Sequence, residues 1–128
     1  LDQTGLSIRP EHIVTSDFTL EGGRRAAQQL IAMGDLPTAV VALNDLMAIG
    51  AILAFQEAGL RVPEDVAVLG FDNIPEATII RPALTTIAQD SVDIGRKLAQ
   101  CLFNRILDPH LPRARFSSEA ALIVRDSA

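Results

Sequence analysis

Residues 62–73, VPEDVAVLGFDN, constrain the fold more than any other part of the sequence. Pro63 fixes its own φ and has no amide hydrogen to donate, so it belongs before a strand and not within one. The run 66–69 is continuously apolar, which is typical of a parallel strand buried on both faces. Asp72 and Asn73 follow directly, and open α/β sheets bind ligands beyond the carboxyl ends of their strands. We therefore expect a buried strand with a polar, ligand-facing end.

Hydrophobic periodicity and turn residues predict the elements on either side of this strand. Upstream, the sequence predicts the tail of a helix at 1–5, a strand at 11–14 and a helix at 20–33 that Thr19 can cap. A strand at 38–43 and a helix at 45–58, capped by Asn44 or Asp45, follow. Downstream, it predicts a short helix from Pro75, a strand at 85–88, a long amphipathic helix from Asp90 to about residue 107 and a last strand at 121–125. Strands and helices that alternate across short connections favour right-handed crossovers. The predicted fold class is therefore α/β, a parallel sheet with flanking helices.

Composition limits the kinds of partner. The net charge is −5, whereas contacts to nucleic-acid phosphates need clustered Lys and Arg, so we expect no nucleic-acid binding by this segment. No run approaches the roughly 18 apolar residues of a membrane helix, and we expect no membrane contact. Cys101 is the sole cysteine and lies in an apolar helix pattern, where a buried structural thiol is expected. Without an intrachain disulfide, the chain suits a reducing compartment, and a cytoplasmic protein is predicted.

Signals for catalysis are weak. The sequence has no glycine-rich phosphate loop and no G-x-S-x-G elbow. His12 and His110 lack metal-ligand spacing, so neither a metal nor another cofactor is expected. Asp45 and Asp72 follow adjacent predicted strands and leave a hydrolase with a carboxylate pair as an open alternative. No residue is an evident nucleophile, and we expect a protein that is not an enzyme.

Polar side chains at two strand ends are candidates for ligand contact. Asn44 and Asp45 follow one predicted strand, and Asp72 follows the next. A carboxylate beside an amide can accept hydrogen bonds from, and donate them to, neighbouring sugar hydroxyls. Helix capping is the alternative for all three. Capping explains Asp45 fully, while for Asp72 ligand contact and capping both stay open.

Phe18 is a candidate for stacking. It is one of only five aromatic residues, all of them Phe, and it lies in the polar loop SDFTLEGG. An apolar ring at a strand-end loop can stack on a sugar face or a purine. A hydrophobic staple onto the following helix is the alternative.

Three motifs, together with the chain's end, carry a family resemblance. VVALNDLMAIGAILAFQEAGL, VPEDVAVLGFDN and PALTTIAQD follow one another, and ALIVRDSA ends the chain. In this order and spacing they resemble the effector-binding domain of the lac-repressor family of bacterial transcription regulators. The resemblance covers residues 1–128 and implies the carboxyl-terminal part of a periplasmic-binding-protein-like domain. The helix-turn-helix and the first half of that domain are absent, and helix 90–107 resembles the crossover into the amino-terminal subdomain.

The resemblance implies roles for single residues. The family's first acid after this strand binds effector, which implies ligand contact for Asp72 and, similarly, for Asn44. The loop after the first strand commonly stacks a ring on the effector, which implies this role for Phe18, with Asp17 as a further candidate. Asn73 stands where the family often has an acid, and this departure leaves its role open.

An apolar patch is the candidate dimer interface. Ile49, with Ile79 and Ile80, could form an exposed patch suited to dimerisation, and plain core packing is the alternative. The three positions resemble those at the family's carboxyl-subdomain dimer interface, which implies a homodimer.

These features together favour a binding module. The leading hypothesis is the effector-binding and dimerisation part of a DNA-binding transcriptional regulator, in which a sugar or nucleoside-like small molecule controls operator binding allosterically. Operator DNA would be bound only through the missing amino-terminal domain. A secreted sugar-binding transport protein of the same architecture is the related alternative, and a small α/β hydrolase is a third.

The resemblance also implies uncovered surfaces. Strands 11–14 and 38–43 would flank a central strand that this sequence lacks, and helix 90–107 would lack the sheet on which it packs. The apolar face of this helix consists of Val92, Leu98, Leu102 and Ile106. Because exposing such a face is costly, we expect a second copy or an internal rearrangement to cover it.

Overall fold

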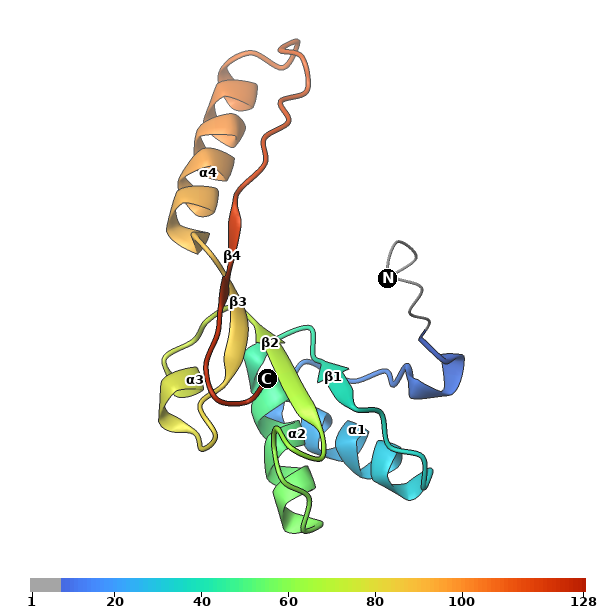
Figure 1. Ribbon diagram of the computed structural model, residues 1–128. Helices are drawn as coiled ribbons and strands as arrows, with labels where there is room; N and C mark the ends of the chain where they lie inside the picture. Colours follow the sequence, from blue (N-terminus) through green and yellow to red (C-terminus); the bar gives the residue numbers. More distant parts are fainter. Residues whose placement is uncertain (1–7) are drawn as a thin grey trace.

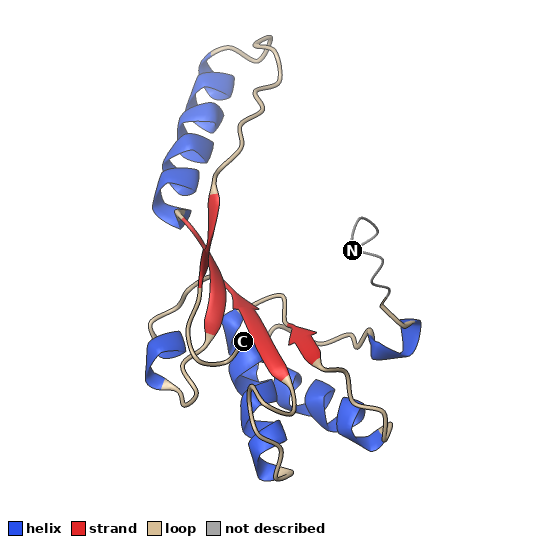
Figure 2. Ribbon diagram, viewed as in Figure 1, coloured by secondary structure: helices blue, strands red, loops and turns tan. Residues whose placement is uncertain are grey.

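A four-stranded sheet organises the chain, and its strands lie in the order β1-β2-β3-β4 (Figure 1). The computed structural model describes residues 8–128. β1 (Ala39–Val41), β2 (Ala67–Phe71) and β3 (Thr85–Gln89) are parallel, and β4 (Ala120–Ile123) runs antiparallel to β3 (Figure 2). The predicted α/β fold with flanking helices is confirmed, and the sheet is mostly parallel, with β4 as its antiparallel strand.

The α-helices of the described chain are α1 (Leu20–Ala32), α2 (Asp45–Glu57), α3 (Glu76–Ile79) and α4 (Ser91–Leu107). All except α3 begin at a side-chain cap. At the start of α1, α2 and α4, a backbone N–H donates to the side-chain oxygen of Thr19, Asn44 and Asp90, at 2.9, 2.8 and 2.8 Å. Asn44, and not Asp45, is therefore the cap of α2.

Helices α1 and α2 lie so close together that two contact points require glycine. A Cβ on Gly23 would lie 2.1 Å from the carbonyl oxygen of Met47, and a Cβ on Gly50 would lie 1.9 Å from that of Leu20. Both obstacles are backbone atoms, which cannot rotate away as a side chain can. The two helices therefore pack backbone against backbone, and this contact positions the loops that precede them.

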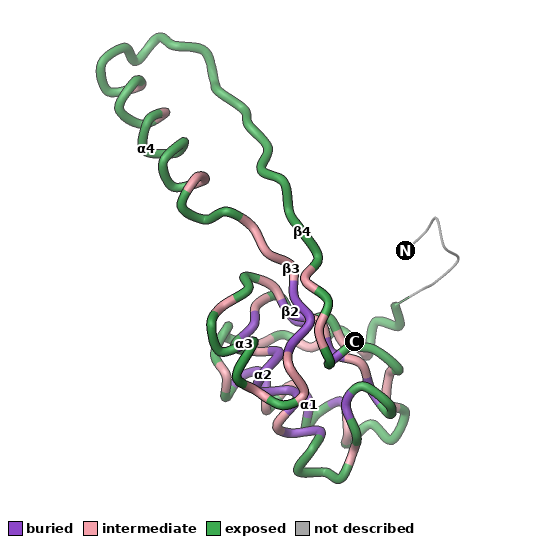
Figure 3. Tube along the Cα trace, turned by 60° about the vertical axis from the view of Figure 1, so that its left-hand side comes forward, coloured by how far each residue is buried: buried purple, intermediate pink, exposed green. Residues whose placement is uncertain are grey.

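The hydrophobic core lies between α2 and the sheet (Figure 3). Ile52 and Phe55 of α2 are fully buried, and so are Val66, Val68 and Leu84 on the side of the sheet. Because α2 contacts α1 as well as β2, it is buried on more than one side, as its nearly uniform apolar sequence predicts. Each of these large side chains stabilises the fold by about 1.5–3 kcal/mol.

Helix α4 projects away from this core together with the ends of β3 and β4 (Figure 1, Figure 3). No residue of α4 is buried within the described chain. Its apolar face is 56–71% exposed at Val92, Leu98, Leu102 and Ile106. Cys101 is half-buried, so the expectation of a buried thiol is wrong. That a second copy covers this face stays a prediction.

The strand expected at 11–14 is wrong. The chain there forms a short 3-10 helix, η2 (Pro10–His12), closed by backbone hydrogen bonds of 2.9 and 3.1 Å. Pro10 favours this turn because its fixed φ suits the first position of a helix. The four described strands pair only with one another, so this segment has no neighbouring strand to extend it. The helix tail expected at 1–5 lies outside the described residues.

The close contact of the helices makes a prediction about stability. We expect Gly50→Ala to lower the free energy of unfolding by about 1–3 kcal/mol, because the new methyl group collides with backbone of α1. Gly95→Ala in α4 is the matched control, since no atom lies within 4 Å of its added Cβ, and it should raise helix stability by roughly 0.5–1 kcal/mol. Urea unfolding followed by circular dichroism measures both, because the chain has no Trp or Tyr. Equal effects of the two substitutions would contradict the packing argument.

Candidate functional site

Polar residues from two neighbouring strands meet at one edge of the sheet. The parallel register of β1 and β2 pairs Val41 with Leu69. Asn44 and Asp72 each follow three residues after this pair, so both lie beyond the carboxyl ends of adjacent strands. The structure thus brings Asn44 and Asp72 to the same edge, where α/β sheets bind ligands.

Phe18 joins this edge through its backbone. The amide Nδ2 of Asn44 donates a 2.9 Å hydrogen bond to the carbonyl oxygen of Phe18. Phe18 is 57% exposed, so its ring does not serve as a packed staple on α1. The Asn44 Oδ1 atom accepts from the Met47 amide, which leaves one N–H and one lone pair of the side chain for another partner.

Backbone strain is concentrated in the same loops. Among the described residues, the non-glycine residues with positive φ are Phe18 at 61°, Asp72 at 113° and Asn73 at 56°. Such conformations cost about 1–3 kcal/mol each and persist only where the surroundings impose them. Two loops far apart in the sequence therefore carry the strain, and both carry predicted ligand-binding residues.

Asp45 has a structural role that capping does not describe. Its side chain is fully buried. One carboxylate oxygen accepts from the Ile74 amide at 2.9 Å, and the other accepts from the Thr86 hydroxyl at 2.5 Å. A Cβ on Gly70 would lie 2.2 Å from the carboxylate, so this position leaves room for it. Asp45 thus ties α2 to the turn after β2 and to β3.

Asp72 differs from Asp45, because the Asp72 carboxylate accepts no hydrogen bond from the described residues. Partial burial raises the pKa of Asp72, and the nearby negative charge of Asp45 raises it further. A strained, uncompensated acid at a strand end is typical of a functional site.

Asp17 is placed differently from Asp72. Its Oδ1 accepts from the amide and hydroxyl of Thr19 at 3.2 and 2.6 Å, and its Oδ2 accepts from Arg25 at 2.7 Å. The hydrogen bond from the Thr19 hydroxyl is the main reason that the pKa of Asp17 is lowered. Both oxygens therefore hold the loop onto α1. Next to Asp17, the buried Ser16 Oγ has no partner among the described residues.

The three isoleucines of the expected interface do not form one patch. Ile49 is 7% exposed and belongs to the core, so the expectation that it is exposed is wrong. Its place on α2 between α1 and the sheet explains the difference. Ile80 is half-buried against the core, and Ile79 is 72% exposed. Of the three, only Ile79 is thus exposed to solvent.

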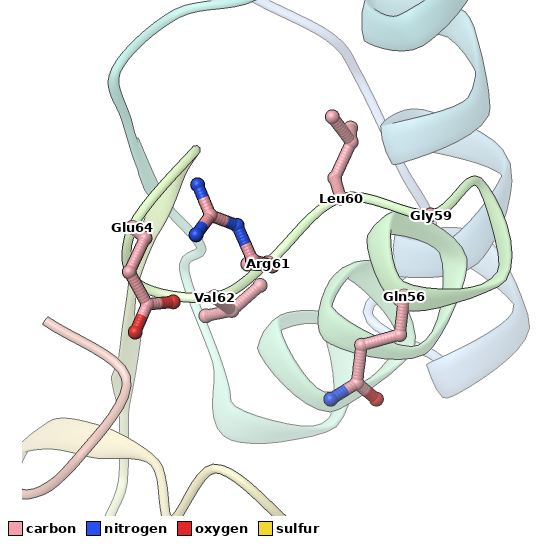
Figure 4. Close-up of a pocket in the computed structure, with 6 residues that line it drawn as sticks. All are labelled: Gln56, Gly59, Leu60, Arg61, Val62 and Glu64. Carbon is pink, nitrogen blue, oxygen red and sulfur yellow. The ribbon is translucent and has the colours of Figure 1, made fainter.

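Two hollows lie away from the strand-end loops. The larger, of about 510 Å³, is an open depression between the end of α2 and the loop leading into β2 (Figure 4), lined by Gln56, Gly59, Leu60, Arg61, Val62 and Glu64. There the Arg61 guanidinium binds Asp65 at 2.7 Å and lowers the pKa of that carboxyl to about 2. The smaller, of about 80 Å³, lies between α1 and the free edge of β1. The larger hollow is at the amino end of β2, opposite Asp72.

In residues 8–128, no group of His, Cys, Asp or Glu side chains is arranged to hold a metal ion. No helix of the described part is both long and apolar enough to cross a bilayer.

One residue of the site was not predicted from the sequence. The Arg125 guanidinium donates to Asn73 Oδ1 and to the Leu84 carbonyl oxygen, both at 2.6 Å. The sequence contained a signal for its partner, Asn73, because Asn is enriched at positive φ among non-glycine residues. Nothing local to Arg125 could identify it, because Asn73 lies 52 positions away.

The opposite pKa shifts of two acids predict opposite effects on stability. The raised pKa of Asp72 makes its ionised form unfavourable in the folded state, a cost that is absent below the ordinary pKa of Asp and appears as the pH rises. Asp72→Asn should therefore raise the free energy of unfolding at neutral pH, with no gain at low pH. Asp65→Asn is the control of opposite sign, because the lowered pKa of Asp65 stabilises the fold above the ordinary pKa and is lost as the pH falls through about 2. Urea unfolding across pH 2–7 measures both, and a destabilised Asp72→Asn variant at neutral pH would contradict the assignment.

Similarity to known proteins agrees with this architecture. The sequence matches the family model of the periplasmic binding protein-like domain over residues 2–128. It is 39% identical to the HTH-type transcriptional repressor CytR of Escherichia coli (strain K12), over 99% of this chain and 37% of that protein. The chain thus spans about 37% of the length of the curated relatives it matches.

Solved structures give the same result. The structure of the transcriptional regulator CelR in complex with cellobiose matches with a TM-score of 0.88 and 34% identity, over 98% of this chain and 38% of that one. A sugar-binding transcriptional regulator of the LacI family from Escherichia coli, complexed with phosphate, matches with a TM-score of 0.84 and 31% identity, over 99% and 45% of the two chains. The resemblance to lac-repressor-type regulators is thereby confirmed, and the chain belongs to the periplasmic binding protein-like domain family.

Proposed function

We propose that this chain is the effector-binding and dimer-forming part of a DNA-binding transcriptional regulator of the lac-repressor type. The observation that carries the proposal is the meeting of loops at the carboxyl edge of the sheet. The turn after β2, with the strained Asp72 and Asn73, lies beside the loop after β1. That loop contains Asn44, which donates a hydrogen bond to the carbonyl oxygen of the strained Phe18. Strain of this kind is found where a binding surface is preorganised. The matched regulators include proteins named as sugar-binding or as a complex with cellobiose.

The side chains at this edge suit a polyhydroxylated ligand. Asp72 supplies a carboxylate with unused acceptor capacity, which binds sugar hydroxyls strongly. Asn44 supplies one free donor and one free acceptor lone pair. Phe18 offers an exposed apolar ring that can stack on a sugar face or a nucleobase. The ligand is therefore a sugar or a nucleoside-like small molecule. Asp17 holds the Phe18 loop onto α1 through its hydrogen bonds to Thr19 and Arg25.

The rest of the regulator completes the site in this proposal. A second subdomain closes over the ligand, α4 is the crossover into it, and the free edge of β1 receives a further strand. The hollow along β1 and the uncovered face of α4 support this arrangement. Ligand closure shifts the population of the conformers that hold a separate DNA-binding domain on its operator. Such a regulator acts in the cytoplasm, where its DNA lies.

The alternatives receive less support. A hydrolase needs two accessible carboxylates, and Asp45 is buried with both oxygens engaged. The matched relatives are transcriptional regulators. A secreted transport protein of the same fold is separated from a regulator by the coding sequence upstream of Leu1: a helix-turn-helix supports the regulator, and a signal peptide supports the transport protein.

Loss of the Asp72 carboxylate tests the proposed site. Titration calorimetry of the parent protein against ribose, cellobiose, adenosine and cytidine should identify at least one ligand. Asp72→Ala should weaken that ligand by roughly 10- to 100-fold, since hydrogen bonds to a charged group contribute about 1.5–3 kcal/mol. Basal operator binding should be unchanged, because Asp72 contacts ligand and not DNA.

Glu64→Ala, in the hollow at the other end of β2, is the matched control and should leave affinity unchanged. Unaltered affinity in Asp72→Ala, or equal losses in both variants, would overturn the assignment of the site.

The dimer surface is proposed at α3. Ile79 is displayed there on a short helix whose end is closed by Arg81, which donates to the carbonyl oxygens of Thr78, Ile79 and Ile80 at 2.9–3.1 Å. A rigid, exposed isoleucine suits a self-complementary two-fold contact. Ile80 supports it from the core side, and Ile49 supports it only indirectly, through the core.

Ile79→Asp tests this surface. A buried charge at the centre of a two-fold interface is costly, so the dimer dissociation constant should rise at least about tenfold in sedimentation equilibrium. Met33→Asp is the control, because Met33 is a 44% exposed apolar residue at the far end of α1. A dimer that persists unchanged in Ile79→Asp would exclude α3 from the interface.

A further inference from the structure

The turn after β2 has a backbone conformation that few non-glycine residues adopt. Asp72 and Asn73 are consecutive non-glycine residues, and their φ angles are 113° and 56°. A side chain in this region is crowded by its own backbone, and Asn and Asp tolerate it better than other non-glycine residues. The φ of Asp72 nevertheless lies outside the left-handed helical well near 60°, and two consecutive residues adopt positive φ. The direction of the Asp72 carboxylate depends on this conformation, so something outside the turn must maintain it.

Three hydrogen bonds hold the turn from outside. The Asp72 amide donates to the Ile87 carbonyl oxygen at 2.9 Å, and the Ile74 amide donates to the buried carboxylate of Asp45, also at 2.9 Å. These two restrain the ends of the turn. Its middle residue is held by the third bond, from Arg125 to Asn73 Oδ1 at 2.6 Å.

Arg125 is well placed to act as a rigid support. It is half-buried, and its second guanidinium nitrogen donates to the Leu84 carbonyl oxygen at 2.6 Å. Its backbone amide donates to the Thr85 hydroxyl at 2.9 Å. The planar fork of a guanidinium suits two acceptors in fixed directions, whereas a lysine ammonium cannot reproduce that geometry. Arg125 also lies two positions after β4, on the segment that returns from the projecting arm.

We propose that Arg125 is a positioning residue that holds Asn73 in its left-handed conformation and thereby directs the Asp72 carboxylate. The guanidinium of Arg125 thus connects the returning segment after β4 to the strand-end turn, in addition to the hydrogen bond from the Asp72 amide to β3. This inference rests on the proposed function, because it treats Asp72 as the ligand contact. It assigns Arg125 a role in positioning Asp72 and not in contacting the ligand.

The first test needs no ligand. In NMR spectra of the full chain, a positive φ gives a strong intraresidue NOE between the amide and Hα protons, which should be seen at Asp72 and Asn73. Arg125→Lys keeps the charge but loses the fork, and it should weaken both NOEs as the turn samples other conformations. Ser127→Ala is the matched control. It removes the hydrogen bonds of Ser127 Oγ to β2 and β3 but leaves the bond from Arg125 to Asn73.

Rescue separates positioning from general stability. Glycine adopts positive φ without support, so Asn73→Gly added to Arg125→Lys should restore the Asp72 NOE. Retained NOEs in Arg125→Lys, or equal losses in Ser127→Ala, would overturn the proposal, and so would failure of the glycine rescue. If Arg125→Lys does not fold, Asn73→Ala and Asn73→Asp replace it. Asn73→Ala removes the acceptor and should lose the Asp72 NOE. Asn73→Asp keeps an acceptor for Arg125 and should retain the Asp72 NOE.

The second test uses the probes named above in the parent protein. If the turn is correctly formed in about a tenth of Arg125→Lys molecules, affinity for whichever of ribose, cellobiose, adenosine or cytidine binds should fall roughly tenfold. Asn73→Gly should recover most of that loss. An unchanged affinity would overturn the link from Arg125 to Asp72. If none of the four binds, the proposed function loses its support, while the NOE experiment still decides the role of Arg125.

Discussion

One buried carboxylate connects parts of this structure that would otherwise be independent. Asp45 opens α2, yet its oxygens accept hydrogen bonds from the Ile74 amide after β2 and from the Thr86 hydroxyl on β3. A buried charge is tolerated only when hydrogen bonds replace its hydration, so the carboxylate holds these elements in one arrangement. Gly70 leaves the space that this requires. The loops beyond the strands take their positions from this contact.

The loops near Asp45 contain both the strained backbone conformations and the unused hydrogen-bonding groups. Asp45 and Asp72 are two acids close enough for the charge of one to raise the pKa of the other, but they have opposite surroundings. The Asp45 carboxylate is buried and each of its oxygens accepts a hydrogen bond, while the Asp72 carboxylate has no hydrogen-bond partner among the described residues. Phe18 and Asn73 add backbone conformations that only their neighbours can impose. This division, in which one acid supports the fold and the other is free, is what a preorganised ligand contact requires.

Features that depend on a few neighbouring residues could be predicted from the sequence. Caps at Thr19 and Asp90 follow from one side chain and the amide three positions later, and the strand at β2 follows from a short apolar run. Predictions failed where the outcome depends on what lies beside a segment. Residues 11–14 have the pattern of a strand but no partner strand. Ile49 resembles a residue of the family's dimer interface but is buried between α1 and the sheet.

By itself, the sequence determined the alternation of strands and helices and the placing of polar residues after each strand, because capping and apolar periodicity act within one or two turns of chain. Only the tertiary structure decided which of two similar acids is free, that Asn44 holds the Phe18 backbone, and that Arg125 supports Asn73. The physical reason is that burial and hydrogen-bond partners are set by residues distant in the chain. A carboxylate becomes saturated or remains available according to the donors that folding brings to it.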